Sequence, residues 1–249
     1  MTGADLPETN AHDPKHRRVA ARRLVRAELI YLVVLVCFAG IAIPAHYFAY
    51  FGWDLRIEQG LQSVANPVLT AIMWAISLPG NFATPYVITA VAVAAFWLTG
   101  FRSESVGLLV SAGGSGAINK LLKFAVGRPR PVDTLVQILP SDRSGLSFPS
   151  GHVAFYVCFF GFLFFVVFAL FPRGSWLRRV FLIATALPVF TVALSRVYLG
   201  AHWPSDTLAA YLWSSVWLAF ALHLYRRWKR NATFHRTSVP PPTPDQKTT

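Results

Sequence analysis

Three polar clusters interrupt the apolar runs of this sequence and carry the residue types that phosphate chemistry needs. The first reads Lys-x6-Arg-Pro (123–131), the second is Pro-Ser-Gly-His (149–152), and the third reads Ser-Arg-x5-His-x3-Asp (195–206). Phosphoryl transfer requires that charge on the phosphate oxygens be held in place. The clusters supply suitable cations, which are Lys123, Arg130 and Arg196.

The second cluster can also bind an anion through its backbone. Ser150 and Gly151 begin an apolar helix, where free N–H groups and the positive end of the helix dipole favour negative charge. Gly151 has no side chain, so a phosphate could approach its backbone closely.

The two histidines suggest a reaction. His202 can attack phosphorus as a neutral imidazole, and Asp206, four residues later, can reach back to stabilise the cation that forms. His152 then suits the general acid for the leaving oxygen and the base that activates water. We therefore predict three catalytic residues, His202, His152 and Asp206, and a phosphate site made of Lys123, Arg130, Ser150, Gly151 and Arg196.

Each cluster also has an ordinary structural explanation. Lys123 and Arg130 could be anchors that snorkel to a membrane surface, which is the commoner fate of such residues. Ser150 could simply cap a helix, and His202 with Asp206 could form an interfacial pair. Other polar residues flank the clusters and could shape a headgroup pocket, namely Arg128, Asp133, Asp142 and Arg143.

Composition indicates a membrane protein. The 249 residues are 54% hydrophobic and only 14% charged, whereas soluble proteins carry about a quarter charged residues. The net charge of +12 sits in short clusters between uncharged runs, as in cytoplasmic loops, which argues against nucleic-acid binding. Cys37 and Cys158 lie inside apolar runs, so we expect neither a disulfide framework nor a metal site.

The apolar runs predict membrane-spanning helices near 28–54, 85–99, 105–124, 151–171, 180–194 and 205–225. The segment 61–78 also has helical spacing, and its position decides the topology. If it crosses the membrane there are seven spans, and if it lies flat there are six. Only six spans gather the arginine clusters on one face, which the positive-inside rule makes cytoplasmic. We therefore predict an all-α membrane protein with six transmembrane helices and an additional interfacial helix.

In order and at every defining position, the three clusters resemble the signature of the type 2 phosphatidic acid phosphatase superfamily, the lipid phosphate phosphatases. The resemblance covers about 121–206, and the helix layout extends it over most of the chain. It implies hydrolysis of a lipid-linked phosphate or diphosphate through a phosphohistidine intermediate, with the residue roles given above. It also implies independence of metals and cofactors, and the sequence offers no carboxylate cluster for magnesium.

The resemblance leaves several lipids open as substrates: undecaprenyl diphosphate, phosphatidylglycerophosphate and phosphatidic acid. A phosphotransferase could use the same phosphohistidine, and no residue distinguishes it from a hydrolase or fixes the oligomeric state. A membrane scaffold or channel with structural polar clusters is the alternative from another class. Soluble haloperoxidases share the signature and lack a membrane body, so they are excluded.

Domain boundaries and location follow from this layout. We expect a cytoplasmic basic N-terminal segment (1–27), a six-helix membrane phosphatase domain (28–226) and a basic, disordered C-terminal tail (227–249). The first apolar run is too long for a signal peptide, so we expect it to stay as a helix in contact with membrane lipids. The site would then face the extracytoplasmic side of the inner (plasma) membrane.

Overall fold

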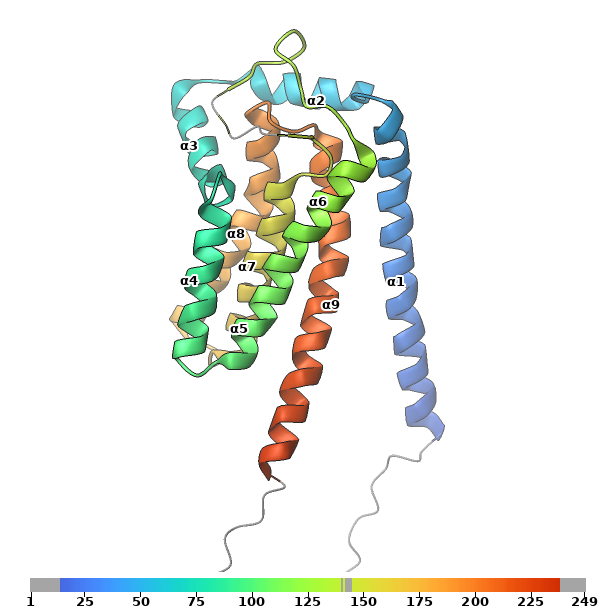
Figure 1. Cartoon of the computed structure of the whole chain (residues 1–249), viewed down its shortest axis with the longest axis vertical. Coiled ribbons are helices and arrows are strands. Elements are labelled where there is room, and N and C mark those ends of the chain that lie inside the picture. The colour runs from blue at the N-terminus through green and yellow to red at the C-terminus, as the bar shows by residue number, and fades with distance from the viewer. Residues whose placement is uncertain (1–13, 140, 142–144, 238–249) are drawn as a thin grey trace, which may run out of the picture.

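A computed structural model describes residues 14–139, 141 and 145–237 as a bundle of helices joined by loops (Figure 1). A 3-10 turn at Leu78–Gly80 (η2) and a π-helical turn at Leu109–Gly113 (η3) connect neighbouring helices. The α-helices are α1 (Pro14–Tyr47), α2 (Gly52–Gln62), α3 (Pro67–Ser77), α4 (Thr84–Leu98), α5 (Arg102–Leu108), α6 (Gly114–Val126), α7 (Gly151–Leu170), α8 (Trp176–Tyr198) and α9 (Pro204–Thr237).

Several of these helices are long and apolar enough to cross a membrane. Four described segments qualify singly, and the pair α3–α4, bent by 55° at its break, would make a fifth; the four are Glu28–Tyr47, Gly151–Leu170, Trp176–Tyr198 and Pro204–Arg230. The chain is therefore an all-α, multi-pass membrane protein. The predicted count of six spans is not confirmed, because the stretch 102–126 is divided by η3 into pieces of 7, 5 and 13 residues.

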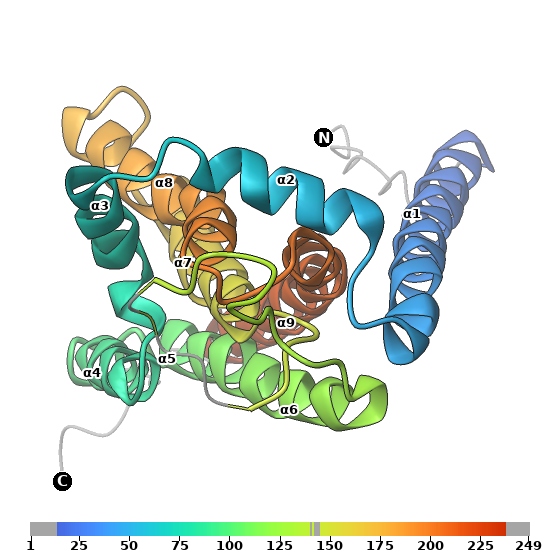
Figure 2. The same ribbon diagram turned by 90° about the horizontal axis from the view of Figure 1, so that it is seen from above.

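The helix that lies across one end of the bundle is α2 (Figures 1 and 2), and we call this end the α2 end. The segment 61–78, expected to lie flat, instead holds the last residues of α2 and then α3. A new helix starts because Asn66 accepts the N–H of Leu69 at 2.9 Å and Pro67 occupies the first turn. The prediction thus placed the interfacial helix too late in the chain.

The orientation of α2 explains this error. Its buried side chains are polar, Asp54, Glu58 and Gln62, while Trp53 and Ile57 are exposed. The polar face therefore points into the protein and apolar groups point outward, the reverse of an ordinary amphipathic helix. A search for apolar runs passes over such a segment.

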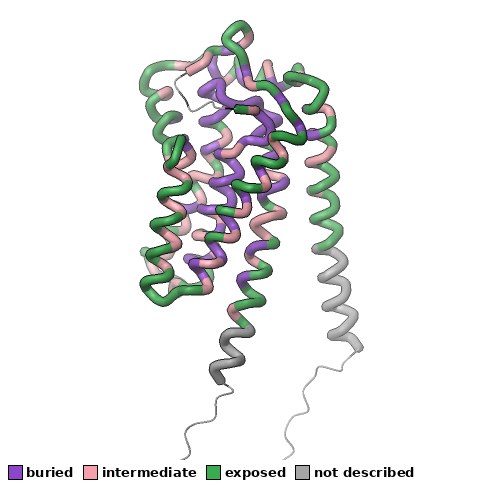
Figure 3. The backbone as a smooth tube through the Cα atoms, viewed as in Figure 1, coloured by how far each residue is buried: buried purple, intermediate pink, exposed green. Residues whose placement is uncertain are grey.

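The core is built around α7. Eleven of its 20 residues are buried, and it packs on α8 and α9 through a cluster that includes Tyr156, Phe159, Phe162 and Val192. Burial is densest toward the α2 end, whereas the described part of α1 is mostly exposed (Figure 3). In a membrane protein such exposed apolar side chains face lipid.

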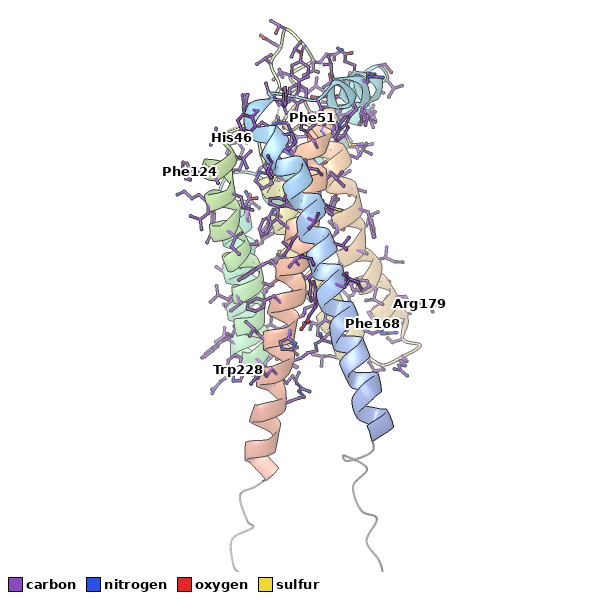
Figure 4. All side chains as sticks on the ribbon, turned by 90° about the vertical axis from the view of Figure 1, so that its right-hand side faces the viewer. His46, Phe51, Phe124, Phe168, Arg179 and Trp228 are labelled. Atoms are coloured by element: carbon purple, nitrogen blue, oxygen red, sulfur yellow. The ribbon has the colours of Figure 1, made fainter. Side chains whose placement is uncertain are left out.

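Several basic residues, in the loop between α7 and α8 and toward the end of α9, lie at the end opposite α2. Both described chain ends lie there, and Arg179 and Trp228 lie far from His46 and Phe51 in Figure 4. Helix α9 continues to Thr237, so the predicted tail 227–249 begins inside a helix, and the predicted segment 1–27 includes the start of α1. Residues 1–13 and 238–249 lie outside the described part of the chain.

Candidate active site

His202 lies in the short loop that joins α8 to α9 at the α2 end. The N–H groups of Ala201 and His202 donate to the carbonyl of Arg196 at 3.0 and 3.3 Å, which closes the end of α8. Gly200 makes this turn with φ +68°, and a Cβ there would lie 2.4 Å from the Gln137 carbonyl oxygen. The chain therefore requires glycine here in order to present His202 at a buried position.

The two nitrogens of the His202 ring face different groups. Nδ1 lies 3.6 Å from Oδ2 of Asp206 and 3.4 Å from the hydroxyl of Ser147. The first distance exceeds an ordinary hydrogen bond, so Asp206 acts on the ring through its charge. Nε2 lies 3.3 Å from Nη1 of Arg130, on the opposite edge of the ring. Nε2 therefore accepts from Arg130 and lies on the side of the ring away from Asp206.

The protonation state of His202 follows from its surroundings. Burial lowers the pKa of His202 well below 6.5, and the nearby charges of Arg130, Lys123 and Arg196 lower that pKa further. The imidazole therefore stays neutral at pH values where an exposed histidine is protonated. Only the neutral ring has a lone pair on Nε2 for attack.

Most of the predicted residues meet at one cavity of about 970 Å³. Its polar wall is formed by Lys123, Arg130, Gly151, His152 and His202. The remaining predicted residues, Ser150, Arg196 and Asp206, are fully buried. The structure therefore brings together residues that lie up to 83 positions apart in the chain, from Lys123 to Asp206.

The cations of the wall are held by backbone oxygens. Lys123 donates to the carbonyl of Leu146, and Arg130 donates to those of Gly145 at 2.9 Å and Ala201 at 2.7 Å. These contacts gather the loop before α7 over His202. Lys123 and Arg130 therefore line the cavity. A side chain that simply snorkels to a membrane surface would not make these backbone contacts.

The start of α7 offers donors to an anion. Ser150 stands at the N-cap, yet its hydroxyl makes no capping bond, and among the described residues it has no hydrogen-bond partner. The first amides of α7 point outward at the same place. The hydroxyl of Ser150 therefore makes no capping bond to α7, and Ser150 is fully buried and does not line the cavity, whereas Gly151 does.

Arg128, one of the flanking residues that could have shaped a headgroup pocket, has a structural partner that sequence reasoning missed. Its side chain is fully buried and donates to Oδ1 of Asp206 at 2.6 Å and to Oδ2 of Asp54 at 3.0 Å. Asp54 also accepts the N–H and hydroxyl of Ser205, each at 2.8 Å. Arg128 therefore ties α2 to the carboxylate behind His202. Sequence reasoning could have found Asp54, because an acidic residue in so apolar a sequence needs a partner of opposite charge.

Ser147 was also missed. Its hydroxyl donates to Oδ2 of Asp206, which in turn accepts the N–H of Trp203 at 3.0 Å. With Arg128 on its other oxygen, Asp206 is fixed on both sides, and so is its position beside His202. Nothing in the local sequence distinguishes Ser147 from any other loop serine.

A neutral histidine backed by a carboxylate and surrounded by cations, inside a membrane helix bundle, defines a membrane-embedded phosphatase. The comparison with known families agrees, since the chain matches the PAP2 superfamily over residues 104–230 and belongs to that superfamily. It is a lipid phosphate phosphatase of a metal-independent family. Within the described residues, no group of three His, Cys, Asp or Glu side chains is placed to hold a metal ion.

Individual relatives support this assignment. The chain is 29% identical over 175 residues to phosphatidylglycerophosphatase B of Bacillus subtilis (strain 168), covering 69% of this chain and 82% of the relative. Its fold resembles the crystal structure of a transmembrane PAP2 type phosphatidylglycerolphosphate phosphatase from Bacillus subtilis, with a TM-score of 0.67, 23% identity and coverage of 79% and 96%. LpxE of Aquifex aeolicus matches with a TM-score of 0.53, 19% identity and coverage of 70% and 96%.

The role of Arg128 generates a prediction about stability. Arg128→Gln should lower the free energy of unfolding by about 3–5 kcal/mol, because it leaves the carboxylates of Asp54 and Asp206 buried without their cation. Thermal unfolding of the detergent-purified protein measures this. Arg56→Gln, an exposed arginine on α2 that bonds only the Gly52 carbonyl, is the matched control and should leave the transition in place. Equal unfolding temperatures for both variants would contradict the prediction.

Proposed function

We propose that this phosphatase hydrolyses a lipid-linked phosphate or diphosphate monoester through a phosphohistidine formed on His202. The observation that carries the proposal is the shape of the cavity. Its polar wall holds His202 and His152, and it continues along apolar residues of α4, such as Val93 and Trp97, and of η3, such as Leu109, and also meets Gly116 of α6. A phosphate at the polar wall would leave an attached lipid tail in the apolar part.

The chemistry uses two steps. In the first, Nε2 of His202 forms a bond to phosphorus while the bond to the leaving oxygen breaks, and His152 gives that oxygen a proton. In the second, His152 takes a proton from water as the water attacks phosphorus and the N–P bond breaks. Asp206 stabilises the cationic ring in between, and the charge on the phosphate oxygens is held by Lys123, Arg130 and Arg196.

Relatives indicate which lipid to test first. The similarity to phosphatidylglycerophosphatase B favours phosphatidylglycerophosphate, ahead of undecaprenyl diphosphate and phosphatidic acid. Each of these lipids joins a terminal phosphate to long apolar chains, in phosphatidylglycerophosphate through a polar headgroup.

Orientation is part of the proposal. We propose six spans, with α3–α4 as one bent span and α5, η3 and α6 together as another, inside a membrane domain of 28–226. Arg102 at the start of α5 and Arg173 in the loop between α7 and α8 then lie with the basic end of α9, on the cytoplasmic side by the positive-inside rule. The α2 end, with His202, would face the extracytoplasmic side of the plasma membrane.

The first prediction here concerns His202. His202→Ala should lower turnover at least about 100-fold, because no other group can form the covalent intermediate. Phosphate release from phosphatidylglycerophosphate, phosphatidic acid and undecaprenyl diphosphate in detergent, with a chelator present, measures it. His223→Ala, at an exposed position on α9, is the control and should keep full activity. A His202→Ala enzyme that keeps more than about a hundredth of the rate would refute the assignment of His202 as the nucleophile.

The same assay separates a hydrolase from a transferase. A phosphorylated lipid product in place of free phosphate would identify a transferase.

The second prediction tests the apolar part of the cavity. A Cβ on Gly116 would meet nothing within 4 Å, so Gly116→Leu keeps the fold and fills the space beside α4. Displacing two methylenes of a lipid tail should cost about 1.6 kcal/mol, which raises KM for a long-chain lipid phosphate about tenfold. p-Nitrophenyl phosphate, which has no tail, should be hydrolysed as before. Gly40→Leu on α1, equally open, is the control, and equal effects on both substrates would contradict the model of tail binding.

The third prediction tests orientation. In a protein that lacks Cys37 and Cys158, single cysteines replace Asp133 in the loop at the α2 end and Arg173 in the loop between α7 and α8, both exposed. A membrane-impermeant thiol reagent should label position 133 on intact cells and reach position 173 only after the cells are opened. The reverse pattern would place the site in the cytoplasm.

A further inference from the structure

The turn between α3 and α4 lies directly against the ring of His152. Oδ1 of Asn81 is 2.8 Å from Nε2 of His152, and these side chains are 1% and 8% exposed. The neighbouring Gly80 is equally close, since a Cβ there would lie 2.3 Å from Cδ2 of the ring. Gly80 and His152 line the cavity, whereas Asn81 does not. The turn therefore supports the ring from outside the place where a phosphate would bind.

The side chain of Asn81 is not needed to form this turn. Its backbone N–H donates to the Leu78 carbonyl at 3.1 Å, and its carbonyl accepts the N–H of Thr84 at 3.0 Å. Any residue could make these two backbone bonds. Among the described residues, the amide nitrogen of the side chain has no partner, so the contact with His152 is the one hydrogen bond that the side chain makes.

Helix α3, which leads directly into the turn, is fixed to the helices that carry the site. On α7, the hydroxyl of Tyr156 donates to the Ile76 carbonyl at 2.5 Å. On α8, Ser195 donates to the Met73 carbonyl at 2.5 Å and lies 2.7 Å from the hydroxyl of Ser77. Arg196 donates to that same Ser77 hydroxyl at 3.2 Å. Asn81 and His152 are therefore held rigidly relative to each other.

From this geometry we infer that Asn81 is the positioning residue of the general acid, and that Nδ1 of His152 is the atom that exchanges the proton. An amide oxygen only accepts, so the nitrogen that faces it, Nε2, carries a hydrogen. The ring that acts as the acid is then the cation, with a second hydrogen on Nδ1: that proton passes to the leaving oxygen and leaves the neutral Nε2–H form, whose Nδ1 later takes a proton from water. The inference rests on the proposed function of His152 as acid and base, and adds to it a residue outside the three sequence clusters.

A comparison of leaving groups tests this role. Asn81→Ala should lower kcat/KM for a short-chain phosphatidic acid at least about tenfold, because its alkoxide must be protonated as it departs. With p-nitrophenyl phosphate, whose phenolate leaves without a proton, the change should be less than about threefold. Both substrates report on the same first step, since kcat/KM includes events only up to departure of the leaving group.

Three further variants complete the test. Asn81→Asp keeps the acceptor oxygen and should restore hydrolysis of phosphatidic acid. Gly80→Ala pushes the same ring and should reproduce the selective loss, which keeps the test available if Asn81→Ala does not fold. Asn66→Ala removes the cap of α3 on the same segment without touching His152, so it should leave the ratio of the two kcat/KM values unchanged.

The outcomes separate the inference from the function on which it rests. If Asn81→Ala lowers hydrolysis of both substrates equally, or of neither, the positioning role is wrong. It is also wrong if the effect of Asn81→Ala persists in a His152→Ala background, where no ring remains to be positioned. If the wild-type protein releases no phosphate, or His202→Ala remains active, the proposed function itself fails.

Discussion

The buried guanidinium of Arg128 is the interaction on which the geometry of the site depends. It reaches Asp206 on α9 and Asp54 on α2, and all three side chains are shielded from solvent. Because an unpaired charge in such surroundings is very unfavourable, the three groups keep one another in place. Asp206 cannot move relative to α2, and His202 beside it is oriented by the same carboxylate. A membrane helix bundle thus obtains a rigid site from a single buried cation.

The cations of the cavity serve two requirements at once. Lys123, Arg130 and Arg196 can hold the charge of a phosphate, and burial together with the same positive field lowers the pKa of His202. A neutral histidine and an anion site therefore arise from one arrangement. In the proposed reaction the ring becomes cationic, and Asp206 at 3.6 Å is positioned to offset its charge. The turn at Gly80 and Asn81 gives His152 a separate support, so the two histidines are positioned by different parts of the chain.

The distribution of polar groups adapts this site to a membrane. Helix α2 turns Asp54, Glu58 and Gln62 inward, toward the end of the bundle that holds His202. The middle of the bundle exposes apolar side chains, and the cavity joins these two environments between α4 and α6. A lipid phosphate has the same division between a charged head and an apolar tail.

Sequence alone determined the three clusters, the all-α membrane class and the family, because these features depend on local spacing and composition. The cavity gathers residues that had been chosen on those grounds, among them Lys123, His152 and His202. Tertiary structure decided which partners these residues have. Arg128 pairs with Asp54 across 74 positions and Asn81 reaches His152 across 71, and no local pattern encodes either contact. The inward polar face of α2 was likewise settled by packing, since an apolar run by itself does not say which face of a helix meets protein and which meets lipid.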